Sequence, residues 1–148
     1  MTKKVREQFK NQLKAKQLKQ TKPREIITDE IMSTKAGDHF TADDLWDRLR
    51  KKKKNISKAT VYRTLNLLTQ EKMIEEHDFG RGQSYYERMV ERPHHDHIIC
   101  VLCGKISEFH NEEIEKIQTN IAKKEKFTVY YHSHKLFGSC SKCSKKGA

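Results

Sequence analysis

The strongest constraint on how this chain folds is the spacing of its four cysteines, which form two Cys-x-x-Cys pairs separated by 36 residues. The pairs are Cys100 with Cys103 and Cys140 with Cys143. Two such pairs on a short chain are typical of a tetrahedral zinc site with four thiolate ligands. The alternative is a pair of disulfides in an exported protein, whereas a reducing compartment favours zinc.

A run of metal-ligand residues, His94-His95-Asp96-His97, directly precedes the first cysteine pair. On a strand, side chains alternate between faces, so His94 and Asp96 point one way and His95 and His97 the other. One short motif can therefore serve two metal sites. Nitrogen and oxygen ligands suit iron, zinc, manganese and cobalt, and they bind more reversibly than four thiolates. We therefore expect a closed structural zinc at the cysteines and metal sensing at the histidines. The alternative is a surface histidine run that binds no metal.

The charge of the chain indicates an anionic partner. The net charge is +11, and 34% of the 148 residues are charged. Residues 1–93 hold 22 Lys and Arg against 14 Asp and Glu, while residues 94–148 hold 9 against 6. Because zinc-bound cysteines are deprotonated, the basic excess belongs mainly to the first part. No apolar run approaches the roughly 20 residues of a membrane span, and the N-terminus lacks the apolar core of a signal peptide. We expect a cytoplasmic protein.

The first part of the chain predicts a winged helix. A helix begins at Thr21-Lys22-Pro23-Arg24, a capping box at Thr41–Asp44 begins a second, and Ser57 caps a third over Lys58–Glu71. The last two helices form a helix-turn-helix, and their alternative is a purely structural helical hairpin. Strands over Met73–Asp78 and Ser84–Met89 then make a hairpin with Arg81 at its tip. The candidate DNA contacts on this part are Lys19, Arg24, Lys58, Thr60, Tyr62, Arg63 and Arg81.

Two lysine-rich stretches each allow two interpretations. Residues 1–20 form a basic arm, either solvated or in contact with phosphates. The run Lys51–Lys54 ends the second helix, where cations favour the negative end of the helix dipole. It is either a solvated helix end or a phosphate contact.

The second part predicts a small α/β domain. A polar stretch ending in Pro93 gives a hinge over residues 91–93 between domains at 1–90 and 94–148. Strands are expected over His94–Cys103, Ile106–Phe109 and Phe127–Tyr131, with one helix capped by Asn111. So few residues make a small core, which favours stabilisation by zinc and by a partner subunit. The fold class is therefore α+β, with a winged helix followed by three strands and one long helix.

An enzyme is not expected. Three histidines with a carboxylate can form a catalytic metal site. The chain, however, has no HExxH motif, no phosphate-binding glycine loop and no nucleophile elbow.

Several motifs together resemble the ferric uptake regulator (Fur) family, and the resemblance extends from about residue 14 to residue 145. They are Leu18-x-x-Thr21-x-Pro23-Arg24, Thr41-Ala42-Asp43-Asp44-Leu45, Ala59-Thr60-Val61-Tyr62-Arg63-Thr64-Leu65, His94-His95-Asp96-His97-x-x-Cys100-x-x-Cys103-Gly104-Lys105 and the last cysteine pair. The family implies a homodimeric, metal-dependent transcriptional repressor. Its second domain mediates dimerisation, and its operator is an AT-rich inverted repeat.

The resemblance also implies roles for the metal ligands. Cys100, Cys103, Cys140 and Cys143 match the structural zinc site. His39, Glu87, His95 and His97 match a regulatory site at the hinge. His94, Asp96, Glu115 and His132 match an additional site, and we place Glu108 near it.

The resemblance favours iron as the regulatory metal, with zinc or manganese able to substitute. The HHDH string is usual in iron sensors, whereas peroxide sensors typically carry aspartates where this chain has Glu87 and Glu108. A zinc-uptake or peroxide-sensing member of the family is the alternative. Metal storage or delivery, or a metalloenzyme, is the alternative of another class.

Overall fold

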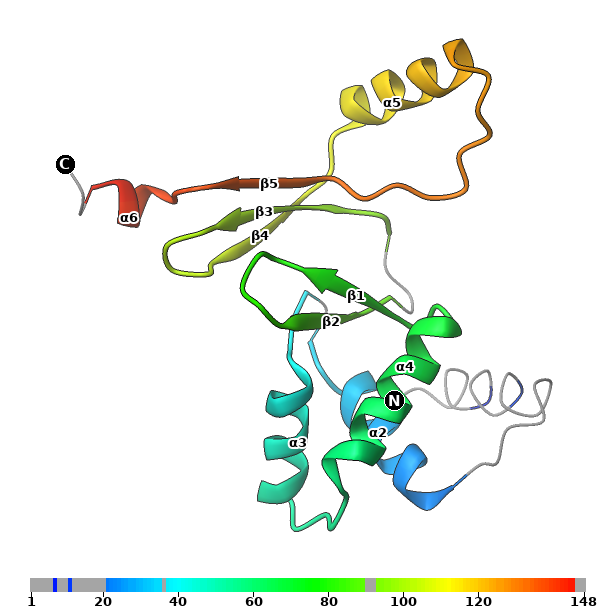
Figure 1. Cartoon of the computed structure of the whole chain (residues 1–148), viewed down its shortest axis with the longest axis vertical. Helices are drawn as coiled ribbons and strands as arrows, with labels where there is room; N and C mark the ends of the chain where they lie inside the picture. Colours follow the sequence, from blue (N-terminus) through cyan, green and yellow to red (C-terminus); the bar gives the residue numbers. More distant parts are fainter. Residues whose placement is uncertain (1–6, 8–10, 12–20, 36, 90–92, 146–148) are drawn as a thin grey trace. The chain divides into compact units, whose positions relative to one another are not determined.

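The computed structural model describes residues 7, 11, 21–35, 37–89 and 93–145 (Figure 1). The chain divides into two compact units, Met1–Arg92 (unit 1) and Pro93–Ala148 (unit 2). Apart from residues 7 and 11, the expected basic arm lies outside the described residues, and Lys19 lies outside with it. Residues 91 and 92 of the expected hinge lie outside them as well.

Unit 1 is a winged helix, as predicted. Its described helices are α2 (Lys22–Met32), α3 (Ala42–Lys51) and α4 (Lys58–Gln70). The wing is formed by β1 (Ile74–Asp78) and β2 (Ser84–Arg88), which pair antiparallel with Ile74 opposite Arg88. Helix α4 follows α3 after a short turn, so the predicted helix-turn-helix is confirmed (Figure 1).

The predicted helix starts are confirmed, two of them by side-chain capping bonds. Thr41 accepts a hydrogen bond from the Asp44 backbone N–H, while the Asp44 carboxylate accepts one from the Thr41 N–H. Ser57 accepts a bond from the Thr60 backbone N–H at the start of α4. Pro23 lies in the first turn of α2, where its missing N–H costs nothing.

The helices of unit 1 enclose an apolar core. Ile31 from α2, Leu45 from α3 and Leu65 from α4 are all fully buried. Burying a side chain of this size stabilises the fold by roughly 1.5–3 kcal/mol. The segment before α3 reaches the wing through an isolated β-bridge between Phe40 and Tyr86.

The turn of the wing depends on two glycines. Gly80 and Gly82 have φ angles of 69° and 70°, in the left-handed region that side chains disfavour. Asp78 Oδ1 accepts a hydrogen bond of 2.7 Å from the Gly80 N–H. Phe79 does not extend into solvent with the turn but is 1% exposed.

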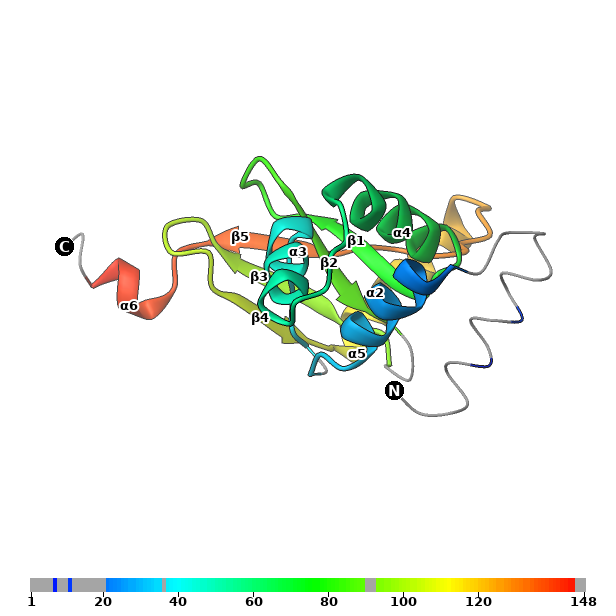
Figure 2. The ribbon, with the colours of Figure 1, turned by 90° about the horizontal axis from the view of Figure 1, so that it is seen from below.

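Unit 2 holds one three-stranded sheet and one long helix. Its elements are β3 (Asp96–Cys100), β4 (Ile106–Phe109), α5 (Glu112–Lys124), β5 (Lys135–Gly138) and the short α6 (Ser141–Ser144). The strand order is β4-β3-β5, as Figure 2 shows. Strand β3 runs antiparallel to β4 and parallel to β5. Asn111 caps α5 as predicted, by accepting bonds from the N–H groups of Glu113 and Ile114.

The predicted strand over Phe127–Tyr131 is wrong. The third strand is Lys135–Gly138, which occupies the edge of β3 that β4 leaves open. Phe127 and Tyr131 lie in irregular chain and are 74% and 86% exposed. The first strand is also shorter than expected at both ends, because it begins at Asp96 rather than His94 and Val101–Cys103 form a turn. Residues 127–131 have the composition of a strand, but they pair with no strand among the described residues.

Unit 2 buries little apolar surface in the single chain. No residue of α5 is buried, and Ile117 and Ile121 are 58% and 57% exposed. Ile99 and Cys100 are its only described apolar residues that are buried. Among the described residues, no helix is long and apolar enough to cross a membrane.

Candidate metal centres and nucleic-acid surface

The four cysteines form one cluster in unit 2. Cys100 ends β3, and Cys140 lies two residues after β5, so the parallel pairing of these strands brings the two cysteine pairs together. One sulfur atom from each of the four lies within 4.8 Å of the others, and Cys103 Sγ lies 3.8 Å from Cys140 Sγ. Four sulfurs bound to one zinc at about 2.3 Å lie about 3.8 Å apart, so the cluster fits the ion.

The thiols of this cluster differ in acidity because backbone amides face only some of them. Hydrogen bonds from the backbone N–H groups of Cys103 and Cys140 lower the pKa of Cys100 to about 6. The Cys140 N–H lies 3.3 Å from Cys100 Sγ. The pKa of Cys143 is raised to about 12, mainly by its hydrogen bonds to the Cys140 and Cys103 side chains. The lowered pKa of Cys100 favours its binding metal as a thiolate.

A second cluster in unit 2 lies around His94 and brings together side chains from β3, from α5 and from the segment before β5. His94 Nε2 lies 3.4 Å from Asp96 Oδ1 and 3.6 Å from Glu115 Oε1. His132 Nε2 lies 3.3 Å from the same Glu115 oxygen and 4.0 Å from Asp96 Oδ1. The structure thus brings together the four residues of the predicted additional site.

The polar atoms of this second cluster suit a cation. Asp96 is 1% exposed, and neither of its carboxylate oxygens has a hydrogen-bond partner among the described residues. Glu115 Oε1 and His132 Nε2 also have no hydrogen-bond partner among the described residues. A buried carboxylate without a donor is costly unless a positive charge compensates it. Two imidazole nitrogens and two carboxylates are ligands that iron, zinc and manganese accept.

Glu108 lies elsewhere than we expected. It stands opposite His97 in the antiparallel pair of β3 and β4, so both side chains lie on the same face of the sheet. Glu108 Oε1 lies 3.9 Å from His95 Nε2, and the His95 and His97 rings are 5.1 Å apart. Glu108 therefore belongs with His95 and His97, on the face opposite Asp96.

In unit 1, two histidines meet one carboxylate. The Phe40–Tyr86 bridge sets the preceding His39 beside Glu87, with His39 Nε2 3.2 Å from Glu87 Oε2. Sequence reasoning predicted this pair but missed His77, whose Nε2 lies 3.5 Å from the same oxygen. No spacing motif marks His77, because it reaches Glu87 only through the pairing of β1 with β2.

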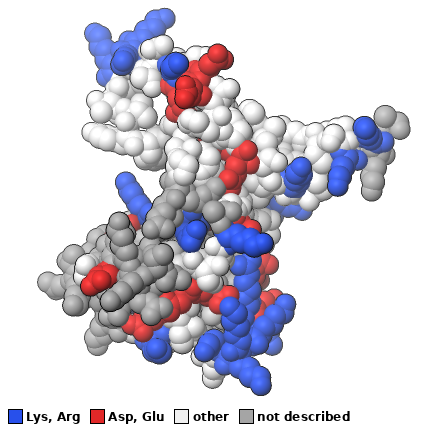
Figure 3. Space-filling view, turned by 180° about the vertical axis from the view of Figure 1, so that it is seen from behind, with Lys and Arg blue, Asp and Glu red and all other residues white. Residues whose placement is uncertain are grey.

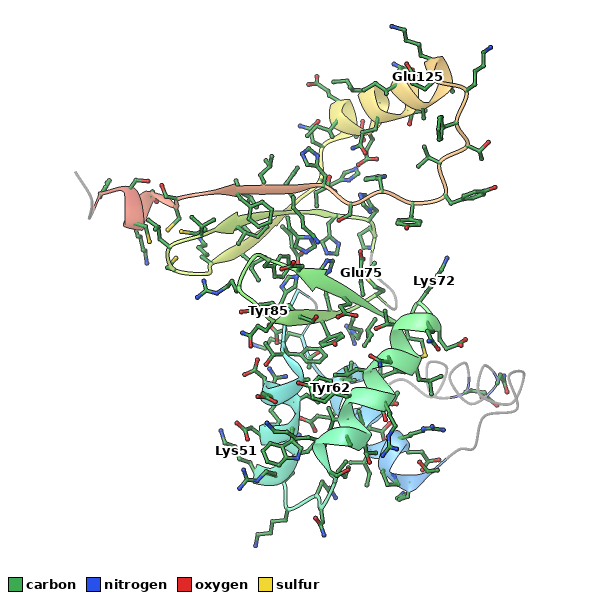
Figure 4. The ribbon with its side chains drawn as sticks, in the orientation of Figure 1. Lys51, Tyr62, Lys72, Glu75, Tyr85 and Glu125 are labelled. Atoms are coloured by element: carbon green, nitrogen blue, oxygen red, sulfur yellow. The ribbon has the colours of Figure 1, made fainter. Side chains whose placement is uncertain are left out.

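Helix α4 carries four of the seven predicted DNA contacts. Tyr62 (labelled in Figure 4) is 47% exposed. Arg63 beside it is also exposed, and its Nε donates to the Ala59 carbonyl. Lys58 Nζ lies 2.9 Å from Asp43 Oδ1, a contact that raises the pKa of Lys58. Thr60 bonds Ser57 in the helix cap, Arg81 is exposed in the wing, and Arg24 lies on α2. Basic and aromatic groups on one helix suit contacts with bases and phosphates.

A basic surface adjoins the start of α4. Figure 3 shows Lys and Arg side chains gathered on the part of unit 1 that carries the turn between α3 and α4. Lys51 ends α3, and Lys52–Lys54 follow it in this turn. Lys52 forms an ion pair of 2.7 Å with Glu30. Among the described residues, no acid pairs with Lys51, Lys53 or Lys54, which form what we term the lysine turn.

The comparisons with known proteins agree with this arrangement. The model of the ferric uptake regulator family matches residues 15–137. The chain belongs to the ferric uptake regulator family. It is 40% identical over 143 residues to the ferric uptake regulation protein of Neisseria meningitidis serogroup A, covering 95% of this chain and 98% of that protein.

Solved structures of the ferric uptake regulator family have the same fold. The Helicobacter pylori regulator, described as having three functional metal binding sites, is 34% identical with a TM-score of 0.83 and covers 97% of this chain and 95% of its own. The Francisella tularensis regulator with iron is 31% identical with a TM-score of 0.76, covering 86% and 95%.

Members of this family are metal-binding regulators of transcription that act on DNA as dimers, and they are not enzymes. A dimer gives a physical reason for the exposed apolar side chains of unit 2. Ile117 and Ile121 lie one turn apart on α5, and a single chain leaves both of them, and Phe127 after the helix, in water.

Proposed function

We propose that this protein is an Fe(II)-dependent repressor of iron-uptake genes, acting in the cytoplasm as a homodimer on an AT-rich inverted repeat. The observation that carries the proposal is that each unit holds its own group of metal-ligand side chains. In unit 1, His39 lies 3.2 Å from Glu87. In unit 2, His95 and His97 lie beside each other with Glu108. The names and ligands of the relatives support iron as the metal.

Each cluster has a different task in this proposal. The four cysteines hold a structural zinc, which does not exchange during regulation. His39, Glu87, His95 and His97 hold the regulatory Fe(II), with Glu108 as a neighbouring ligand on the unit 2 side. His94, Asp96, Glu115 and His132 hold a further divalent metal within unit 2, and the buried, unbonded oxygens of Asp96 support this assignment.

The regulatory ligands come from both units, so holding one ion between them fixes the angle of the DNA-binding units. The metal shifts this equilibrium only by its differential affinity for the two arrangements. In the selected arrangement, Tyr62 and Arg63 of each subunit enter the major groove, where they contact bases and phosphates. Lys19, Arg24, Lys58, Thr60 and Arg81 add further contacts to the DNA.

The test is DNA binding measured by fluorescence anisotropy on a labelled AT-rich inverted repeat. Protein with zinc-loaded cysteines is titrated anaerobically with Fe(II), Mn(II) or Zn(II). We expect metal to raise the affinity at least about fivefold, the lower end of typical coupling between two sites. The metal effective at the lowest free concentration, weighed against its cellular availability, then separates an iron sensor from a zinc sensor.

Two double variants make the test specific. His95→Ala with His97→Ala is expected to abolish the metal response. His110→Ala with His134→Ala removes two histidines of the same unit that lie outside these ligand groups, so its response should equal that of the wild type. Metal-dependent binding that survives in the first variant would overturn the regulatory site. A wild type that ignores every metal would favour metal storage.

A further inference from the structure

The backbone of unit 1 places three metal-ligand side chains on one face of the wing. His77 on β1 stands opposite Tyr85 on β2, and Glu87 lies two residues beyond Tyr85. Side chains two residues apart on a strand share a face, so Glu87 is the diagonal neighbour of His77. The Phe40–Tyr86 bridge adds His39 to the same place. We term His39, His77 and Glu87 the wing triad.

The distances within the wing triad are those between ligands of one metal ion. Glu87 Oε2 lies 3.2 Å from His39 Nε2 and 3.5 Å from His77 Nε2. Bonds of about 2.0–2.2 Å to nitrogen and oxygen place neighbouring ligand atoms about 2.9–3.6 Å apart. One ligand atom from each of the three residues lies within 4.8 Å of the others. Both distances to Glu87 therefore fit a single ion as the side chains stand.

The surroundings of His77 orient its ring toward Glu87. Phe79 stacks on the His77 ring at 5.2 Å with an interplanar angle of 15°. On the other edge of the ring, His77 Nδ1 lies 4.0 Å from Glu75 Oε1 (Glu75 is labelled in Figure 4). This separation is longer than a hydrogen bond, so the Phe79 stack, rather than Glu75, restrains the ring.

We propose that His77 is a ligand of the regulatory metal, so that unit 1 contributes a complete two-histidine, one-carboxylate set rather than the pair His39 and Glu87. This set is characteristic of Fe(II) sites with open positions. The inference rests on the proposed function, whose regulatory ion it assigns a further ligand. In this proposal, unit 1 supplies three bonds to the ion, and the ligands of unit 2 supply the remaining bonds.

The experiment counts metal-bound histidines by proton NMR of the full-length, zinc-loaded protein with Co(II) added. Each ligated imidazole gives one exchangeable N–H signal shifted far outside the normal range by the paramagnetic ion. His77→Gln is expected to lose one such signal relative to the wild type and to bind Co(II) at the regulatory site at least about tenfold more weakly. His110→Gln, which replaces a histidine outside the wing triad, is the matched control and should keep every signal.

The outcomes separate ligation from a structural role. If His77 only positions Glu87, the variant keeps the wild-type number of signals at saturating Co(II), and the proposal is overturned. A urea titration of the metal-free proteins checks that unit 1 still folds, and His77→Asn serves as a second variant if His77→Gln does not. Operator binding by Co(II)-loaded wild type is measured in parallel. Its absence would count against the proposed function, whereas an unchanged signal count counts against His77 alone.

Discussion

Asp96 shows how strand position alone can prepare a buried side chain for metal. It is 1% exposed, and its carboxylate oxygens accept no hydrogen bond from the described residues. Its place at the start of β3 directs it to the side of the sheet where His94 and His132 lie. The His94 and His132 imidazoles lie 3.4 and 4.0 Å from the carboxylate, and a bound cation would offset the cost of burying this negative charge.

Asp96→Asn removes that charge with little change of shape. We expect the protein to bind one divalent ion fewer per chain while keeping its structural zinc. The stabilisation that metal gives, about 2.7 kcal/mol at a free concentration 100 times the Kd, should disappear for this site. Metal content by mass spectrometry and melting temperature with and without Mn(II) check both points. Glu113→Gln, an exposed acid in the same unit, is the control, and unchanged metal content in Asp96→Asn would contradict the assignment.

Strand periodicity alone grouped correctly only residues of one stretch, whereas Glu115, His132 and the pair of His39 with Glu87 were grouped through the family resemblance. Alternation separated His94 and Asp96 from His95 and His97, and the distances agree. Glu108 was placed with the wrong group, because its face depends on the register of β4 against β3. His77 was missed for the same reason, since only the register of β1 against β2 brings it to Glu87. Register is a property of two strands, and no spacing within either strand encodes it.

At the level of whole elements, helices were predicted more accurately than strands. The caps at Thr41, Ser57 and Asn111 are local signals, and all three helices begin where those caps stand. The strand over Phe127–Tyr131 was predicted from its composition, yet a strand also needs a partner. Lys135–Gly138 pairs with β3 instead, although its four residues gave no recognisable strand pattern.

The lysine turn between α3 and α4 gives a prediction about salt. If Lys51, Lys53 and Lys54 neutralise phosphates, replacing all three by Gln should lower the slope of log K against log salt by about 0.9 for each phosphate that is no longer neutralised. Lys52 is left in place because it pairs with Glu30. Anisotropy titrations across a series of salt concentrations measure the slope.

The end of α5 offers a matched control for this variant. Lys123 and Lys124 end that helix, and Lys126 follows in the left-handed region at φ 60°, just as Lys53 has φ 54° in the lysine turn. Gln at Lys123, Lys124 and Lys126 therefore makes the same change of charge in the same local structure. Equal salt slopes for the two triple variants would show that the lysine turn is only a solvated helix end.

For the molecule as a whole, the two units differ in what stabilises them. Unit 1 has a continuous apolar core, whereas the described part of unit 2 buries only Ile99 and Cys100 among its apolar residues. Binding of a structural zinc is worth about 10–16 kcal/mol in small zinc domains. We therefore expect zinc and the partner subunit to supply most of the stability of unit 2.

Removing zinc with a strong chelator should unfold unit 2 and dissociate the dimer while unit 1 stays folded. Sedimentation velocity reports the dimer, and far-ultraviolet circular dichroism reports the loss of α5. Trp46 is the single tryptophan of the chain and lies in unit 1, where its Nε1 donates to the Ile56 carbonyl at 3.0 Å. Its fluorescence should keep a cooperative urea transition after chelation. A chelated protein that remains dimeric with its full helix content would contradict this division.

Because ligands of the two metal groups alternate along His94–His97, the spacing of one group cannot change during evolution without changing that of the other. Each group takes every second residue of the same stretch, so the spacing of the residues decides which ligand belongs to which group. A substitution at one position damages one group and leaves the other intact. An insertion or deletion of a single residue within the stretch instead exchanges the partners of both groups at once. The two groups can therefore diverge in ligand type but not in length, and this short stretch should tolerate changes of residue far better than changes of spacing.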